Sequence, residues 1–263
     1  MAFSLPGIKD RVGETTRSDT WWLVPSIMAA IFVAFVIYAM WASIINPTAA
    51  PGRYYYDNDG AHFLSPFYSP NFSEMFPNVG FFKFFPAFWV VWLPSLFRLT
   101  CYYGRKAYYR SLLLSPPACA VGKGSDRGYK GETALPWVIN NIHRYFFYLI
   151  VILVVFHWKH FFDAFSFTGG FGMSVGSLVI AADTILLTLY VASCHSFRHL
   201  IGGGTDCFSC IRGGETRHNA WRGVSWLNQF HNAFFWTSLM TVGFADLYVR
   251  MVAMGHWTDM RLF

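Results

Sequence analysis

Cysteine and histidine are the residues of this sequence with the most evident capacity for chemistry, and several stand close together. Cys194 directly precedes His195 and His199, and the two histidines are four residues apart, which places them on one face of a helix. A CxxC pattern, Cys207 to Cys210, follows shortly after. Thiolate and imidazole are ligands of iron–sulfur clusters and zinc, and two of each form the ligand set of a Rieske-type [2Fe–2S] centre. The spacing therefore indicates a metal centre. Two further candidate ligands are Cys101 and Cys119.

The same histidines are open to a second interpretation, a haem b held between two helices of a bundle. The candidate axial ligands are His143, His231 and one of the pair His195 and His199. A third interpretation is a structural zinc ion, or thiols that pack as small apolar side chains. The cysteine spacing differs from that of soluble Rieske proteins, so the residue pattern by itself leaves these interpretations open.

Two arginines, Arg98 and Arg144, lie within apolar stretches of the sequence. A charge inside a membrane is costly, which makes it a candidate for function. Together with His143, Tyr145 and Trp226, the arginines are expected to line a quinone pocket, which needs an apolar slot and donors for two carbonyl oxygens. The alternative is that both arginines extend their charged groups to the membrane surface.

Two carboxylates, Asp183 and Asp246, also lie within apolar stretches. Asp246 stands four residues before Arg250, so we expect an ion pair between them. A transporter or channel would use the two carboxylates as a polar path. That function class is disfavoured because the sequence shows no inverted repeat and no pair of broken helices.

The elements that must position these side chains are membrane-spanning helices. Of the 263 residues, 54% are hydrophobic and 13% are charged, whereas soluble globular domains are about 25% charged. A membrane helix needs about 20 mostly apolar residues, and five stretches meet that requirement. They predict an all-α integral membrane protein, with a single domain over residues 1–263 and a bundle of five transmembrane helices at about 21–45, 81–103, 136–162, 173–200 and 226–252.

The orientation of this bundle follows from the distribution of Lys and Arg. Basic residues fill the loop between the second and third predicted helices and the loop between the fourth and fifth, whereas residues 166–172 contain none. The positive-inside rule then predicts a cytoplasmic N-terminus and an external C-terminus. All five cysteines would lie at the reducing, cytoplasmic side, where we expect no structural disulfide. The net charge of +6 is explained by these loops and not by a nucleic-acid-binding surface.

Several runs of residues resemble the SdhC-like, cytochrome b-type membrane-anchor subunit of a bacterial succinate dehydrogenase (complex II). The match is closest to the branch whose anchor holds a membrane-embedded Rieske-type [2Fe–2S] cluster. The resemblance covers the second to fifth predicted helices, and the run Ser193–His199 is its most specific element. The other runs are Cys101–Arg110, Ser115–Val121, His143–Tyr145 and Asp246–Arg250.

This resemblance implies a function, partners and a location. Electrons from succinate would pass from a flavoprotein subunit and an iron–sulfur subunit, docked on the cytoplasmic side, through a metal centre of this chain to quinone in the bacterial cell membrane. The sequence has no flavin or succinate motif, so succinate oxidation itself would take place in another subunit. The residues that belong to recurring motifs of the family are Cys101, Cys119, His143, Cys194, His195 and His199.

Overall fold

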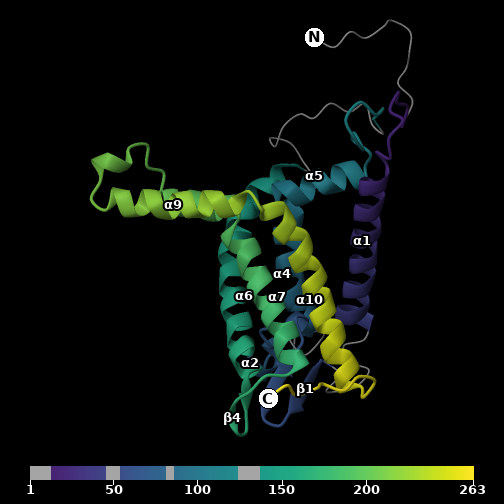
Figure 1. The fold of residues 1–263 in the computed structure, drawn as a ribbon, viewed down its shortest axis with the longest axis vertical. Coiled ribbons are helices and arrows are strands. Elements are labelled where there is room, and N and C mark those ends of the chain that lie inside the picture. The colour runs from purple at the N-terminus through teal and green to yellow at the C-terminus, as the bar shows by residue number, and fades with distance from the viewer. Residues whose placement is uncertain (1–12, 46–53, 81–85, 124–136) are drawn as a thin grey trace, which may run out of the picture.

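Long helices run side by side along the long axis of the molecule (Figure 1). The computed structural model describes residues 13–45, 54–80, 86–123 and 137–263. The first residues of two predicted segments, 81–85 and 136, lie outside these ranges. The long helices of the bundle are α1 (Leu23–Met40), α4 (Pro86–Thr100), α6 (His143–Asp163), α7 (Val175–Ala192) and α10 (His231–Ala253). A π-helical turn (Trp41–Ile45) continues α1, and a 3-10 segment (Trp137–Ile142) precedes α6.

Three helices of the described residues are long and apolar enough to cross a membrane: Leu23–Ile44, His143–Asp163 and Val175–Ala192. The other two predicted spans, in α4 and α10, are not among these three helices, for local reasons. Helix α4 has only 15 residues and contains Pro94, which removes one backbone hydrogen bond. Helix α10 has 23 residues but carries Asp246 and Arg250. The fold is therefore that of a helical membrane protein, and the five spans remain a prediction.

At one end of the bundle the chain turns into shorter helices that run across the bundle axis. The sequence had predicted that the membrane-spanning helices would continue there. The prediction of one helix over 173–200 is wrong, because the chain breaks at Cys194 and restarts as α8 (His195–Gly202). A break at Cys101 likewise separates α4 from α5 (Tyr102–Ser111). Helix α9 (Gly214–Asn228) ends before α10 begins, so the predicted span from 226 starts late. Figure 1 shows α5 and α9 extending from the same end of the bundle.

The turn into α5 depends on a glycine. A Cβ added at Gly104 would lie 2.6 Å from the Arg98 carbonyl oxygen and 2.9 Å from the Phe235 ring. Only glycine therefore lets α5 pack this closely against α4 and α10. The α8 turn is stabilised instead by Arg198, whose Nε donates to Ser225 Oγ at 2.8 Å on α9 and whose guanidinium lies over the Trp221 ring.

A small β-hairpin covers part of the opposite end of the bundle, between α1 and α4 in the sequence. Strand β1 (Tyr55–Asn58) pairs antiparallel with β2 (Ala61–Leu64), and the turn residues Asp59 and Gly60 both have positive φ, as a two-residue hairpin turn requires. The other elements at or near this end are η2 (Pro66–Tyr68), α2 (Phe72–Met75), β3 (Ser166–Phe167) and β4 (Gly170–Phe171).

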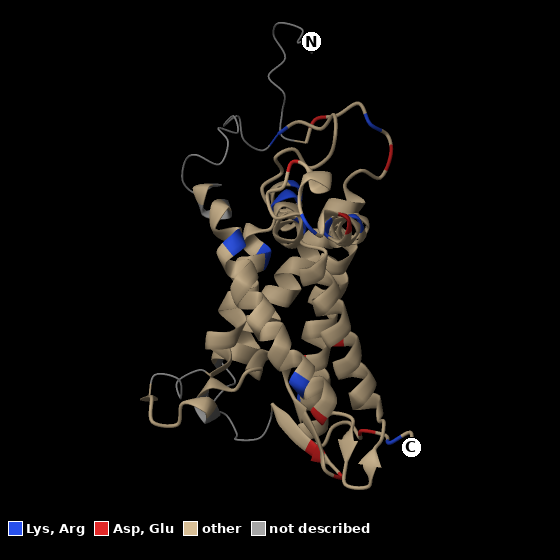
Figure 2. Cartoon of the chain, turned by 90° about the vertical axis from the view of Figure 1, so that its left-hand side faces the viewer, with Lys and Arg blue, Asp and Glu red and all other residues tan. Residues whose placement is uncertain are grey.

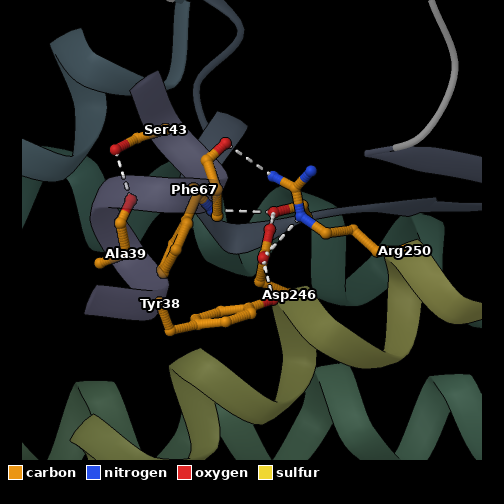
Figure 3. A network of polar contacts seen from close by, with 8 residues as sticks. Tyr38, Ala39, Ser43, Phe67, Asp246 and Arg250 are labelled. Atoms are coloured by element: carbon orange, nitrogen blue, oxygen red, sulfur yellow. Dashed lines mark hydrogen bonds and ion pairs between the residues drawn. The ribbon is translucent and has the colours of Figure 1, made fainter. Parts of the chain in front are cut away.

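A buried ion pair ties α10 to α1 and to the segment after the hairpin (Figure 3). Arg250 Nε donates to Asp246 Oδ2 at 2.7 Å, which confirms the predicted pairing. Tyr38 Oη donates to the same oxygen at 2.5 Å, and Ser65 Oγ donates to Oδ1. Arg250 Nη2 donates to the Ala42 carbonyl at 3.1 Å. The two charges are thus compensated within the protein and bind three segments together.

Candidate metal centre

A cavity of about 340 Å³ opens where the long helices meet the sideways helices. Two cysteines and three histidines line it, and four of these five residues form two close Cys–His pairs: Cys101 with His231, and Cys194 with His143. Each stands at a break in the helical structure. The cysteines immediately precede α5 and α8, with nearly identical extended backbone angles, and the histidines are the first residues of α6 and α10. Four separate breaks in the chain therefore deliver the four side chains to one place.

One Cys–His pair lies between α4 and α10. The Cys101 sulfur is 3.4 Å from His231 Nε2, and both residues are only 2% exposed. The other ring nitrogen of the histidine, Nδ1, is 2.8 Å from Ser193 Oγ. Tyr190 stacks on the imidazole with ring centroids 5.0 Å apart. The imidazole is therefore held by both a hydrogen bond and an aromatic ring.

The second pair repeats this arrangement between α7 and α6. The Cys194 sulfur, 1% exposed, is 3.3 Å from His143 Nε2. His143 Nδ1 is 2.8 Å from Thr100 Oγ1, and Phe97 stacks on the ring with centroids 4.5 Å apart. Cys101 directly follows Thr100, whose hydroxyl group contacts His143 of the second pair. In the same way, Cys194 directly follows Ser193, whose hydroxyl group contacts His231 of the first pair.

The two hydroxyl groups determine which histidine nitrogen carries the proton. Ser193 Oγ donates to the Tyr190 carbonyl at 3.0 Å, and Thr100 Oγ1 donates to the Leu96 carbonyl at 2.8 Å. Since each hydroxyl proton is used in this way, each hydroxyl oxygen accepts from the Nδ1–H of its histidine. Both Nε2 atoms then present a lone pair toward a sulfur atom and the cavity. A neutral imidazole oriented through its other nitrogen is the form that binds metals.

The cysteines are placed at the start of helices, where unpaired backbone N–H groups favour negative charge. The backbone N–H groups of Tyr103 and Gly104 lie next to the Cys101 thiol, and those of Ser196 and Phe197 lie next to the Cys194 thiol. A thiolate is the form of cysteine that binds a metal. Each sulfur atom therefore lies beside two backbone N–H groups, which can donate to a sulfur that binds a metal.

The arrangement is one of two pairs and does not form a single tight cluster. Among the residues that the structure describes, no three His, Cys, Asp or Glu side chains are close enough together to hold one metal ion. The two pairs together offer two thiols and two imidazoles, and the His195 imidazole also lines the cavity.

The other predicted metal ligands lie outside this arrangement or at its rim. His195 lines the cavity from α8, and its Nε2 is 2.9 Å from His199 Nε2, as their four-residue spacing predicted. Burial lowers the pKa of His195, and the neighbouring His199 and Arg198 lower it further, which favours the neutral ring. Cys119 is an exposed free thiol in the loop after α5.

The expectation of no disulfide is wrong for the CxxC pair. Cys207 and Cys210 are joined in a disulfide around the short 3-10 turn Phe208–Cys210, with Cα atoms 5.4 Å apart. A three-residue separation in such a turn brings two cysteines within the usual Cα distance for a disulfide. The pair lies beside α9 and does not line the cavity.

The predicted quinone residues are spread over several surfaces. His143 lines the cavity, whereas Arg98 is buried inside the bundle, where it donates to the Phe235 carbonyl at 2.7 Å and to Ser238 Oγ at 2.9 Å. Arg98 therefore does not extend to the membrane surface. Tyr145 and Trp226 point outward, with 68% and 60% exposed, and Arg144 is also exposed.

Sequence reasoning missed the hydroxyl residues Thr100 and Ser193 as groups that orient the histidines. A signal for them existed: a hydroxyl residue directly before a cysteine occurs at two helix ends, as Thr100-Cys101 and Ser193-Cys194. Other cavity residues that it missed are Tyr103, Arg105, Ser196 and Asn228.

Comparison with known proteins agrees with this architecture. Residues 23–255 match the family model described as actinobacterial succinate dehydrogenase subunit SdhC. The structure is similar to a chain of the Mycobacterium smegmatis Sdh1 complex in the apo form, with 37% sequence identity, a TM-score of 0.81 and 98% of each chain covered. No curated protein matches the sequence. The chain therefore belongs to the SdhC family of actinobacterial succinate dehydrogenases and is a membrane-anchor subunit of such a complex.

Proposed function

We propose that this chain carries electrons from the iron–sulfur subunit of its complex to quinone, through a Rieske-type [2Fe–2S] centre held in the cavity described above. The observation that carries the proposal is the convergence of Cys101, Cys194, His143 and His231 on that cavity. Two thiolates and two imidazoles are the ligand set of a Rieske-type centre. Cys101 and Cys194 were predicted as metal ligands from the sequence, whereas His143 and His231 were predicted for haem.

Such a cluster, when bound, accepts and releases one electron, at a potential of about −150 to +300 mV compared with about −400 mV for plant-type ferredoxins. The higher range suits transfer to quinone. The protein contributes the orientation of the ligands: Ser193 and Thr100 hold the imidazoles, and the first turns of α5 and α8 place backbone N–H groups beside the two sulfur atoms.

The same cavity offers groups for the quinone itself. Tyr103, Arg105 and Asn228 line it, and their N–H and O–H groups are of the kind that bind carbonyl oxygens. Reduction of a quinone to a quinol consumes two electrons and two protons. The hydrogen-bonded histidines His199 and His195 connect the exposed surface to the cavity, and we propose that they deliver these protons.

The docking and orientation of the complex are part of the same proposal. Most Lys and Arg residues that the structure describes lie toward the end of the bundle that carries α5 and α9 (Figure 2). We propose that this end is cytoplasmic and receives the flavoprotein and iron–sulfur subunits. Electrons from the soluble subunits would then enter on the side where the cavity opens.

Electron paramagnetic resonance of the reduced, purified complex tests the cluster and its ligands. We expect His231→Ala and Cys101→Ser to abolish a [2Fe–2S] signal of the membrane subunit while the signals of the soluble subunits persist. The matched controls, His199→Ala and Cys210→Ser, change the same residue types outside the four-residue set and are expected to retain the signal.

Two outcomes would contradict this assignment. Retention of the signal in the cavity variants, with its loss in the controls, would transfer the ligand role to the exposed residues. Loss of a haem b absorption band in His143→Ala and His231→Ala, with no [2Fe–2S] signal in the unmodified complex, would establish the haem alternative.

A further inference from the structure

A second cavity, about 390 Å³ in volume, lies beside α1 at the same end of the molecule. Its polar rim carries three basic side chains: Arg17 from the segment before α1, and Lys106 and Arg110 from α5. The aromatic ring of Trp21 also lines it, as is common where a protein crosses a membrane surface. The cavity thus joins positive charge with an interfacial aromatic side chain.

Two of the three positive charges of this basic cavity are not balanced by an acidic side chain within the described residues. Lys106 and Arg110 are four residues apart on one helix, an arrangement that like-charge repulsion disfavours. Neither forms an ion pair with an acidic side chain in the part of the chain that the structure describes. Arg17 binds Asp19, and its Nη1 donates to the Cys119 carbonyl at 3.2 Å. An anion bound between the two α5 side chains would remove their repulsion.

An apolar groove continues from the basic cavity along the bundle, between α1 and α10. The first section, about 510 Å³, shares Val24 and Met28 with the basic cavity, and the next, about 330 Å³, shares Ile31 and Met240 with the first. From Val24 to Tyr38 the groove follows α1 for about 20 Å, at 1.5 Å per residue. This exceeds the thickness of one leaflet, about half of the roughly 30 Å hydrocarbon core.

We propose that the basic cavity and the groove together bind one anionic phospholipid. Its phosphate would lie between Lys106 and Arg110, and an acyl chain would lie along the groove between α1 and α10. Basic pockets between membrane helices bind anionic lipid head groups in this way. Only 6% of the apolar window of α1 is buried within the protein, so a bound acyl chain would also cover a helix face that the rest of the chain leaves open.

The charge of the cavity distinguishes this ligand from a quinone. A quinone tail would also fit an apolar groove, but its head group is neutral and needs hydrogen-bond donors rather than several cations. A phosphodiester carries a full negative charge and pairs with Lys and Arg. The proposal is independent of the metal centre and would stand if that centre proved to be a haem.

Native mass spectrometry of the purified, delipidated complex tests the proposal, with dioleoyl phosphatidylglycerol and dioleoyl phosphatidylcholine as probes. The two lipids have the same acyl chains and differ in head-group charge. We expect one tightly bound phosphatidylglycerol per SdhC chain, with phosphatidylcholine weaker by on the order of ten-fold. We expect the double variant Lys106→Gln with Arg110→Gln to bind phosphatidylglycerol as weakly as it binds phosphatidylcholine.

Control measurements separate this site from general attraction to a basic protein. The matched variant Arg217→Gln with Arg222→Gln removes the same charge from the exposed side of α9 and is expected to retain the preference. Glycerol 3-phosphate, which has the charge without the chains, is expected not to displace the lipid. Equal binding of the two lipids, or an equal loss in both double variants, would overturn the proposal. Displacement of phosphatidylglycerol by a short-chain quinone would identify the groove as a quinone site instead.

Discussion

At the scale of single residues, the hydroxyl groups beside the cysteines explain how the cavity can present two neutral imidazoles. Thr100 and Ser193 each donate their own proton to a helix carbonyl and therefore accept from a histidine Nδ1. Each thus fixes the tautomer of a histidine that it does not neighbour in sequence. Cys101 belongs to one Cys–His pair, while the adjacent Thr100 contacts the histidine of the other pair. Cys194 and Ser193 are arranged in the same way, so two dipeptides connect the two pairs.

Removing one of these hydroxyls should weaken the centre without abolishing it. We expect Ser193→Ala or Thr100→Val to lower metal content or quinone reductase activity by roughly 10- to 100-fold, the usual effect of removing a group that orients a metal ligand. The conservative change Thr100→Ser should retain function, because the hydroxyl remains. Ser238→Ala is the control, since that buried hydroxyl accepts from Arg98 away from the cavity. Unchanged iron content and reductase activity in both test variants would show that the hydroxyls do not orient ligands.

At the scale of elements, two buried carboxylates of the bundle, Asp246 and Asp183, differ in their polar contacts. Near the end with the hairpin, Asp246 and Arg250 of α10 bind Tyr38 and the Ala42 carbonyl of the first helix. Asp183 on α7 is different, because its Oδ1 is buried and has no hydrogen-bond partner among the residues that the structure describes. Two buried carboxylates of the same chain therefore contribute differently to the packing of the helices.

This difference predicts that replacing the two carboxylates destabilises the protein by unequal amounts. We expect Asp246→Ala to destabilise the protein by about 3–5 kcal/mol, because Arg250 is left buried without its partner. Replacing both residues, as Asp246→Ala with Arg250→Met, should recover much of that loss. Asp183→Asn should have a small effect, because it breaks no hydrogen bond. Unfolding of the purified protein, followed by circular dichroism, measures all three, and equal destabilisation by Asp246→Ala and Asp183→Asn would contradict this account.

At the scale of the whole molecule, the two ends of the bundle differ in charge and in architecture. One end carries the sideways helices, most of the basic residues and both large polar cavities, and the other carries the hairpin and the C-terminal tail (Figures 1 and 2). From the positive-inside rule we propose that the basic end is cytoplasmic. Succinate dehydrogenase partners would then meet the chain on the side where electrons must enter.

Reporter cysteines at the two ends test this orientation in intact cells. We expect a membrane-impermeant thiol reagent to label Thr258→Cys from outside and to label Thr216→Cys only after the cells are permeabilised. Both residues are exposed, and both changes are made with Cys119, Cys207 and Cys210 replaced by serine. Labelling of Thr216→Cys in intact cells would reverse the assigned orientation.

The sequence by itself determined the class of protein and the chemistry available to it. Composition and apolar stretches predicted a helical membrane protein, because lipid demands long apolar segments regardless of how they pack. The four-residue spacings correctly predicted that His195 and His199 share a helix face and that Asp246 pairs with Arg250, because helix geometry fixes which side chains share a face.

Only the tertiary structure decided which cysteines and histidines meet. Sequence proximity favoured His195 and His199 as partners of Cys194, but the helix breaks at Cys194 and its sulfur faces His143, which is 51 residues away. Helix breaks depend on backbone angles at single residues and on close contacts such as that of Gly104 with the Arg98 carbonyl, which hydrophobic periodicity does not record. Pairing between distant helices depends on how the bundle packs, and for that reason the grouping of Cys101 with His231 could be seen only in three dimensions.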